Sequence, residues 1–387
     1  MIDLRDYIDP VSIEKPLWSH IPETSRLSHN IQINTDNNIL NKPEDSGLAI
    51  IGVPDDRRSP NKGCAEAPDA VRAELYQLSR IPGRQKITDL GNIKKGVGFD
   101  DTLTALTDVC SQLLEQGVIP LIIGGSSSLN LALNRALMLT GERYSVASVD
   151  SRIDWVNESR EHDAYNYLPL ILKNNKQLLN FVNIGYQTYL NDPQVLNRLK
   201  KKNCDLIRIG EVRNDIQEVE PLFRDSDLIS FDISAVRQSD APGSWAPSSN
   251  GFYGEEICLL SRYAGLSDRL KICGFFETNP LLDSRKITVN LQAQMLWFFI
   301  EGHSQKQNEY AALGKENSGR FVNYHVSIKD STEELVFVKS TMTNRWWIVL
   351  LDNKGRKQYI ACSYKDYLQA SENEVPKRWM KAISMNF

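Results

Sequence analysis

The sequence has no long apolar run, no paired-cysteine motif and no excess of basic residues. Without a run long enough to cross a bilayer, no membrane span is expected. The six cysteines form no CxxC, which argues against a zinc site or a disulfide framework. A net charge of −4 favours neither nucleic acid nor an anionic membrane surface as a partner. We therefore expect no nucleic-acid partner and a reducing, cytoplasmic location.

Two common catalytic and nucleotide-binding motifs are also missing. The segment GGSSS, residues 124–128, lacks the G-x-S-x-G spacing of a nucleophile elbow. It also lacks the lysine of a phosphate-binding loop. We interpret it as a strand-to-helix turn in which Ser128 caps the next helix.

From residue 47 to about residue 305, apolar runs alternate with helical segments. The runs LAIIGVP and VIPLIIGG are continuously apolar, which predicts strands buried on both faces. Segments such as DTLTALTDVCSQLLEQG have helical spacing and lie between these runs. Seven or eight strands fit this pattern, so the sequence predicts an α/β domain with a mostly parallel sheet. Functional groups are then expected beyond the carboxyl ends of the strands.

The two ends of the chain differ from this domain. Residues 1–46 are polar and are predicted to be an N-terminal extension. Residues 315–387 are predicted to be a small β-rich extension, with a hairpin turn at DNKG and a final helix interrupted at Pro376. We expect Trp346, Trp347 and Trp379 in its core. A sheet this small is marginal alone, so we predict a partner-binding or self-association surface, with a brace on the main domain as the alternative.

Polar motifs follow several of the predicted strands. They are GGSSS (124–128), DSRID (150–154), SFDIS (230–234) and FFETNP (275–280), with GVPDD…NKGCAEAPDAVR (52–72) upstream and APGSWAPSSNGFYGEE (241–256) further on. In order and chemistry these motifs resemble the arginase, agmatinase and formiminoglutamase superfamily, the ureohydrolases, over roughly residues 45–305. The resemblance implies a three-layer arginase-like fold. It also implies a site with two manganese ions, whose bridging water attacks a guanidinium or formimino carbon.

Motif by motif, the resemblance implies that half of the six metal ligands are replaced. The family's GGDHS places its histidine at Ser127. Its Asp-x-His-x-Asp falls on Asp150, Arg152 and Asp154, so a second histidine is replaced by arginine. Its SFDxD falls on Asp232 and Ser234, so an aspartate is replaced by serine. Asp150, Asp154 and Asp232 remain as the ligands of any metal that does bind.

Other residues complete the predicted pocket. Glu277 matches the glutamate that receives the substrate's cationic group, and it either keeps that role or pairs with a nearby base. None of the five histidines falls on a ligand position, but His162 follows Asp154 in a loop that leads toward the pocket.

Arg152 changes the chemistry expected of this site. A guanidinium keeps its proton and cannot coordinate a cation. Placed among three aspartates, it is expected to neutralise them through bidentate hydrogen bonds. We therefore predict no metal cofactor, with manganese as the cofactor only if this interpretation is wrong.

These observations favour a catalytically inactive ureohydrolase-fold protein that acts as a binding or scaffold subunit, with a protein partner or a homo-oligomer. One alternative is an active hydrolase of a formimino- or guanidino-compound, a C–N hydrolase of linear amidines. Another is a small-molecule sensor that uses the same pocket with Glu277 as anchor.

Overall fold

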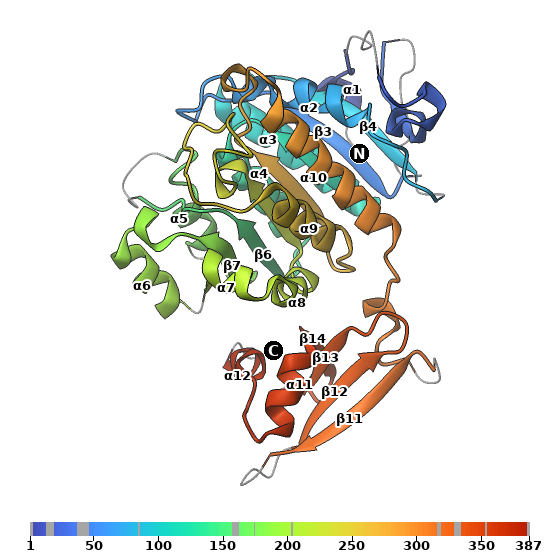
Figure 1. Cartoon of the computed structure of the whole chain (residues 1–387), viewed down its shortest axis with the longest axis vertical. Coiled ribbons are helices and arrows are strands. Elements are labelled where there is room, and N and C mark those ends of the chain that lie inside the picture. The colour runs from blue at the N-terminus through green and yellow to red at the C-terminus, as the bar shows by residue number, and fades with distance from the viewer. Residues whose placement is uncertain are drawn as a thin grey trace.

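The computed structural model contains a large, mostly parallel sheet and a separate four-stranded antiparallel sheet near the C-terminus (Figure 1). The structure describes residues 3–12, 19–36, 46–83, 86–156, 162–173, 175–202, 204–315, 319–328, 334–352 and 354–384. Residues 37–45 of the predicted N-terminal extension lie outside these ranges.

The large sheet has the strand order β1-β4-β3-β5-β10-β9-β6-β7-β8, and β2 also pairs with β4. Its strands are β1 (Ile8–Asp9), β2 (Ile31–Ile33), β3 (Leu48–Val53), β4 (Ile87–Ile93), β5 (Ile119–Gly124), β6 (Tyr144–Val149), β7 (Leu178–Tyr186), β8 (Asp205–Arg208), β9 (Leu228–Asp232) and β10 (Ile272–Phe276). Among the described strands of this sheet, only β1 runs antiparallel to its neighbour. The apolar runs correctly predicted the parallel strands except β2 and β4. β2 lies in the segment predicted as a polar N-terminal extension, and β4 was missed because Asp89, Gly91 and Asn92 interrupt its apolar pattern.

Helices cover both faces of this sheet (Figure 1). One face packs against α2 (Ala67–Leu75), α7 (Ile209–Asn214), α8 (Val219–Arg224), α9 (Gly254–Gly265) and α10 (Ile287–Ser304). The other packs against α1 (Leu4–Tyr7), α3 (Phe99–Glu115), α4 (Asn130–Leu139), α5 (Leu168–Leu172) and α6 (Pro193–Lys201). In β3, Leu48 and Ile50 contribute to the first core and Ala49 and Ile51 to the second, as expected of a strand buried on both sides. The predicted three-layer α/β fold is confirmed.

No described helix is both long enough and apolar enough to cross a membrane.

The C-terminal unit is a sheet with the order β11-β12-β13-β14, packed against a helix. Its elements are β11 (Phe321–Ser327), β12 (Glu334–Ser340), β13 (Trp346–Leu351), β14 (Lys357–Cys362), α11 (Tyr364–Ser371) and α12 (Lys377–Ser384). The predicted hairpin joins β13 to β14, although Asn353 of its turn lies outside the described residues. Two helices separated at Pro376 replace the single interrupted helix of the prediction. Trp346 lies in the core of this unit and Trp379 packs against it, as predicted. Trp347 is buried but lies outside that core, where the guanidinium of Arg224 covers its ring.

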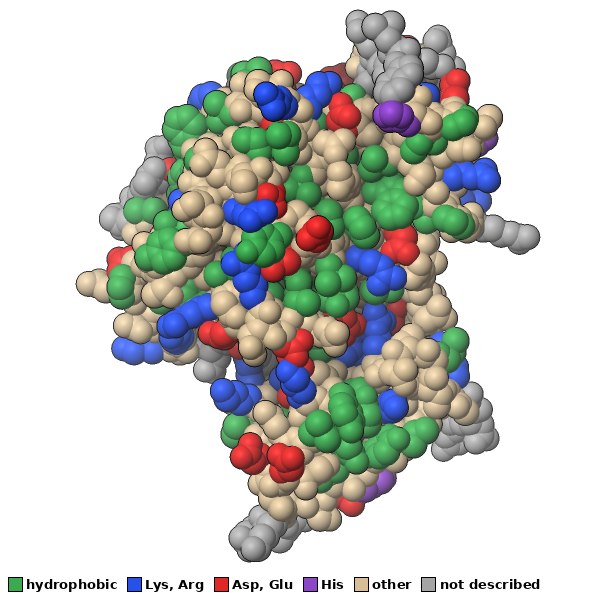
Figure 2. Space-filling view, in the orientation of Figure 1, with side chains coloured by type: hydrophobic (Ala, Val, Ile, Leu, Met, Phe, Trp, Pro, Cys, Tyr) green, Lys and Arg blue, Asp and Glu red, His purple; other side chains and the backbone are tan. Residues whose placement is uncertain are grey.

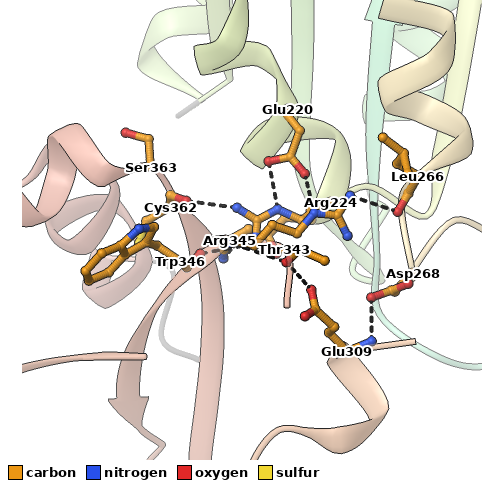
Figure 3. Close-up of polar contacts among 12 residues, drawn as sticks. Glu220, Arg224, Leu266, Asp268, Glu309, Thr343, Arg345, Trp346, Cys362 and Ser363 are labelled. Carbon is orange, nitrogen blue, oxygen red and sulfur yellow. Dashed lines mark hydrogen bonds and ion pairs between the residues drawn. The ribbon is translucent and has the colours of Figure 1, made fainter. Parts of the chain in front are cut away.

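Arg224 joins the C-terminal unit to the main domain (Figure 3). From α8, its guanidinium donates to the carbonyl oxygens of Trp346 (3.1 Å) and Cys362 (2.8 Å). Glu220 lies between two cations, 2.9 Å from Arg224 and 3.0 Å from Arg345 of the C-terminal unit. The side chain of Arg224 is only 4% exposed, so these charges are largely shielded from water.

A second set of contacts lies beside the first (Figure 3). Asp268 accepts a hydrogen bond from the backbone N–H of Glu309 at 2.9 Å. The Glu309 carboxylate in turn accepts from the hydroxyls of Ser340 and of Thr343, the latter at 2.7 Å. The unit is therefore docked by polar contacts, which supports the brace alternative for this side of it. The chain boundaries at 1–46, 47–305 and 315–387 remain a prediction.

Candidate functional site

A small cavity lies where the carboxyl ends of three neighbouring strands meet. In sheet order these strands are β10, β9 and β6. The cavity measures about 10 Å³, enough for roughly one water molecule. It is lined by Asp150, Arg152, Asp154, Tyr165, Asp232, Ser234, Ser244, Trp245, Ala246 and Glu277. Six of the eight predicted pocket residues are in this set; Ser127 and His162 are not.

Arg152 lines the cavity but does not bind the carboxylates as predicted. Its backbone N–H donates to Asp150 at 2.9 Å, closing a tight turn after β6. Its guanidinium donates to Ser151 Oγ and to the carbonyl of Ala246, both at 3.3 Å. Among the described residues it donates no hydrogen bond to the three aspartates, so the predicted bidentate pairing is wrong. The turn directs the side chain toward the 241–251 loop, where a carbonyl is available.

The three aspartates consequently remain a crowded acidic cluster. Burial raises the pKa of Asp150 well above its usual range, and the charge of Asp232 adds to this effect. Burial also raises the pKa of Asp154, with further contributions from both neighbouring carboxylates. Arg152 acts on this cluster at longer range, because its positive charge partly lowers the pKa values of Asp150 and Asp232. The guanidinium of Arg152 thus offsets the repulsion among the aspartates electrostatically, without a hydrogen bond to any of them.

Ser234 stands between two of these aspartates. Its backbone N–H donates to Asp232 at 2.8 Å, and its hydroxyl donates to Asp150 at 3.3 Å. Burial raises the pKa of Asp232, and the hydroxyl and N–H of Ser234 oppose that rise. A neutral hydroxyl therefore links two carboxylates that would otherwise face each other.

Glu277 is held in place from several sides. It directly follows β10 and has a left-handed backbone, φ 66°, which is strained for a residue with a side chain. Its carboxylate accepts from the N–H of Ser127 (2.7 Å), the amide of Asn61 (2.9 Å) and the hydroxyl of Ser59 (3.1 Å). Burial, together with the charge of Asp232, raises its pKa to about 7 despite these donors. In this structure its described hydrogen-bond partners are neutral protein groups rather than a base.

Ser127 and His162 lie outside the cavity lining. The hydroxyl of Ser127 donates to the carbonyl of Ala164 at 3.0 Å. His162 has its Nε2 3.9 Å from a carboxylate oxygen of Asp100, at the start of α3. The predicted cap is also corrected: the hydroxyl of Ser126 accepts from the N–H of Ser128 and caps a short 3-10 turn, Ser127–Leu129, whereas no side chain caps α4.

Sequence reasoning missed the residues that support and close the site. Ser59 and Asn61 come from the loop after β3, and Trp245 and Ala246 from the loop before α9. Tyr165 approaches from the segment before α5. The motifs around 52–72 and 241–256 contain four of these residues, but nothing in them indicates which side chains turn inward. Within the described ranges, no group of three or more His, Cys, Asp or Glu is arranged to hold a metal ion.

The molecule is a three-layer α/β protein with an acidic cavity at the carboxyl edge of its sheet. Comparison with known proteins identifies its family. The arginase family model matches residues 46–300, about two thirds of the chain. The chain belongs to the arginase family. The C-terminal unit lies outside the matched residues.

Individual relatives within this family are distant. The formimidoylglutamase of Bacillus subtilis is 24% identical over 280 residues, covering 66% of this chain and 87% of the relative. That of Photorhabdus laumondii is 21% identical over 266 residues, covering 65% and 84%.

Solved structures confirm the fold. Trypanosoma cruzi formiminoglutamase with Mn²⁺ is similar with a TM-score of 0.65 at 21% identity, covering 69% of this chain and 96% of that one. Bacillus subtilis formimidoylglutamase gives a TM-score of 0.66 at 22% identity, covering 76% and 97%. At these identities the similarity establishes the architecture alone.

Proposed function

We propose that this chain is a non-hydrolytic member of the arginase family that acts as a binding or scaffold subunit. One observation carries the proposal: the guanidinium of Arg152, fixed to Ser151 and Ala246, lines the cavity at the strand ends. In the family resemblance this position belongs to a metal-binding histidine. A fixed positive charge there repels a divalent cation rather than binding it.

The donor chemistry of the other replaced positions agrees with this proposal. Ser127 already donates its hydroxyl to the carbonyl of Ala164, and Ser234 supplies only a neutral hydroxyl. Two manganese ions require several carboxylate or imidazole donors. The residues present therefore do not fit a binuclear manganese site.

A second candidate is a formiminoglutamase-like hydrolase. It is supported by relatives named formimidoylglutamase and by the convergence of Asp150, Asp154, Asp232 and Glu277 on one cavity. A small-molecule sensor receives less support, because the cavity has room for roughly one water molecule and Glu277 is already occupied by protein donors.

Metal content and turnover distinguish the first two candidates. We expect purified protein incubated with Mn²⁺ and desalted to retain no stoichiometric manganese by elemental analysis. We expect no release of formamide or urea from formiminoglutamate, agmatine or arginine. One or two manganese ions per chain, with turnover that a chelator abolishes, would establish the hydrolase instead.

Restoring the missing donors tests the structural premise. The triple variant Ser127→His, Arg152→His and Ser234→Asp is expected to bind manganese measurably, because it supplies two imidazoles and a carboxylate at convergent strand ends. A matched triple variant with Arg152→Gln in place of Arg152→His removes the cation but adds no imidazole at position 152, and it should bind manganese more weakly. If the folded histidine variant binds no manganese in a titration calorimeter, the strand ends do not converge as the family's do.

A further inference from the structure

The two edges of the C-terminal sheet are in different environments. At the β14 edge, the N–H of Ala361 donates to Asp225 at 2.9 Å, and the carbonyl of Cys362 accepts from Arg224. The main domain therefore satisfies backbone groups of this strand. At the opposite edge, β11 pairs only with β12, and Figure 1 shows no other described strand alongside it. One edge of the sheet is thus covered and the other is open.

β11 lacks the features that normally protect an open edge. Its sequence, FVNYHVS, contains no Lys, Arg, Asp, Glu, Pro or Gly. Natural edge strands are usually blocked by such residues, since unpaired backbone groups otherwise recruit another strand. Val322 on this strand is 42% exposed. The imidazole of His325 lies 2.9 Å from the carboxylate of Glu334 on the neighbouring strand. The strand is seven residues long and partly apolar, and it has no charged residue or proline that would block pairing with another strand.

The strand is also complementary to itself. In an antiparallel pair centred on Tyr324, Val322 lies opposite Val326 of a second copy, and Asn323 lies opposite His325. Phe321 at one end lies opposite Ser327 at the other. No like charges face each other, and two pairs of β-branched side chains meet, which stabilises cross-strand pairing. The sequence numbers of opposed residues differ by an even number. Backbone N–H and C=O groups that point away from β12 in one copy therefore meet groups that point away from β12 in the other.

We propose that two copies of this chain associate through antiparallel pairing of β11 with β11, centred on Tyr324, to form one eight-stranded sheet. A second copy is the fitting partner because a single two-fold contact covers both open edges and leaves none for further growth. Phe321, Asn323 and His325 also line a groove of about 970 Å³, which residues 313–315 and α12 border on the same face of the sheet. Pairing places the two grooves side by side. This surface lies outside the arginase-family match, and the proposal does not depend on whether the cavity is catalytic.

A charge placed on the open edge tests the interface. We expect light scattering over a concentration series to show a reversible dimer of the full chain. Val322→Lys should raise the dissociation constant of this dimer about tenfold or more, because the lysine enters the contact twice, each time opposite Val326. Met380→Lys is the matched control: Met380 is 48% exposed on α12, where the neighbouring Lys381 donates to Asn180 of the main domain, and the substitution should leave the dimer unchanged. A chain that is monomeric at all concentrations, or a dimer that Val322→Lys does not weaken, overturns the proposal.

The register is tested by cysteine pairs. Directly opposed residues of antiparallel strands lie about 4.5–5.5 Å apart, within reach of a disulfide. Oxidising a mixture of Val322→Cys and Val326→Cys chains should therefore give a crosslinked dimer. Either variant alone should give no crosslinked dimer, because the same position in the two copies is separated by four residues, roughly 13 Å, along the strands. The unsubstituted chain, whose described cysteines are all buried or half-buried, gives the background. Equal crosslinking by Val322→Cys alone would rule out this register, and the test remains usable if Val322→Lys fails to fold.

Discussion

Arg72→Met is expected to lower the free energy of unfolding by about 3–5 kcal/mol, the usual cost of leaving a buried charge without its partner. Arg72 is fully buried on α2 and holds Asp89 of β4 bidentately, at 2.8 and 3.0 Å. It also donates to the carbonyl of Gly91 at 2.8 Å and to the side chain of Asn92. Methionine keeps the apolar stem but removes every donor, so Asp89 keeps only the hydroxyl of Tyr76 and the N–H of Gly91. Urea denaturation measures the loss.

A matched pair on the surface provides the control. Arg5 holds Asp3 with the same bidentate geometry but is 65% exposed, so Arg5→Met should leave the unfolding midpoint unchanged. Combining Arg72→Met with Asp89→Asn should recover part of the loss, because the second change removes the unpaired charge. If Arg72→Met and Arg5→Met unfold at the same urea concentration, the buried pair does not stabilise the domain.

Arg224→Met is expected to loosen the C-terminal unit and to cost about 3 kcal/mol. The substitution leaves the carbonyls of Trp346 and Cys362 without their donor, at roughly 1–3 kcal/mol for each buried group. It also removes the guanidinium that lies over the Trp347 ring, 4.8 Å from its centre. Glu220 stays paired with Arg345, so the interface is weakened rather than abolished. Limited proteolysis should then cut the connection between residues 305 and 320 faster, and denaturation should show an earlier transition.

The control for this prediction lies on the same unit. Arg356 is 69% exposed and pairs with Asp352 within the β13–β14 hairpin, so Arg356→Met should change neither proteolysis nor stability. Unchanged cleavage and an unchanged transition for Arg224→Met would mean that the unit is held by other contacts. The brace role of this side of the unit would then be wrong.

The sequence by itself determined the architecture of the main domain. Strands such as β3 and β5 are continuous apolar runs because both of their faces are covered by helices, and that pattern can be recognised without a partner in view. The order of the strand-end motifs indicated the family, and the family model matches the same part of the chain. Six of the predicted pocket residues do meet at one cavity, because carboxyl ends of neighbouring parallel strands share an edge.

Only the tertiary structure decided how the polar groups of this protein are satisfied. β4 was missed because its buried Asp89 is stabilised by Arg72 on a helix, a partner that local patterning does not reveal. Arg152 was expected to bind the aspartates next to it in sequence, yet its guanidinium reaches Ala246, 94 residues away. Glu277 is held by Asn61 and Ser59, more than 200 residues before it. Apolar burial leaves a periodic record along the chain, whereas a hydrogen bond depends on one donor and one acceptor that the fold brings together from distant segments.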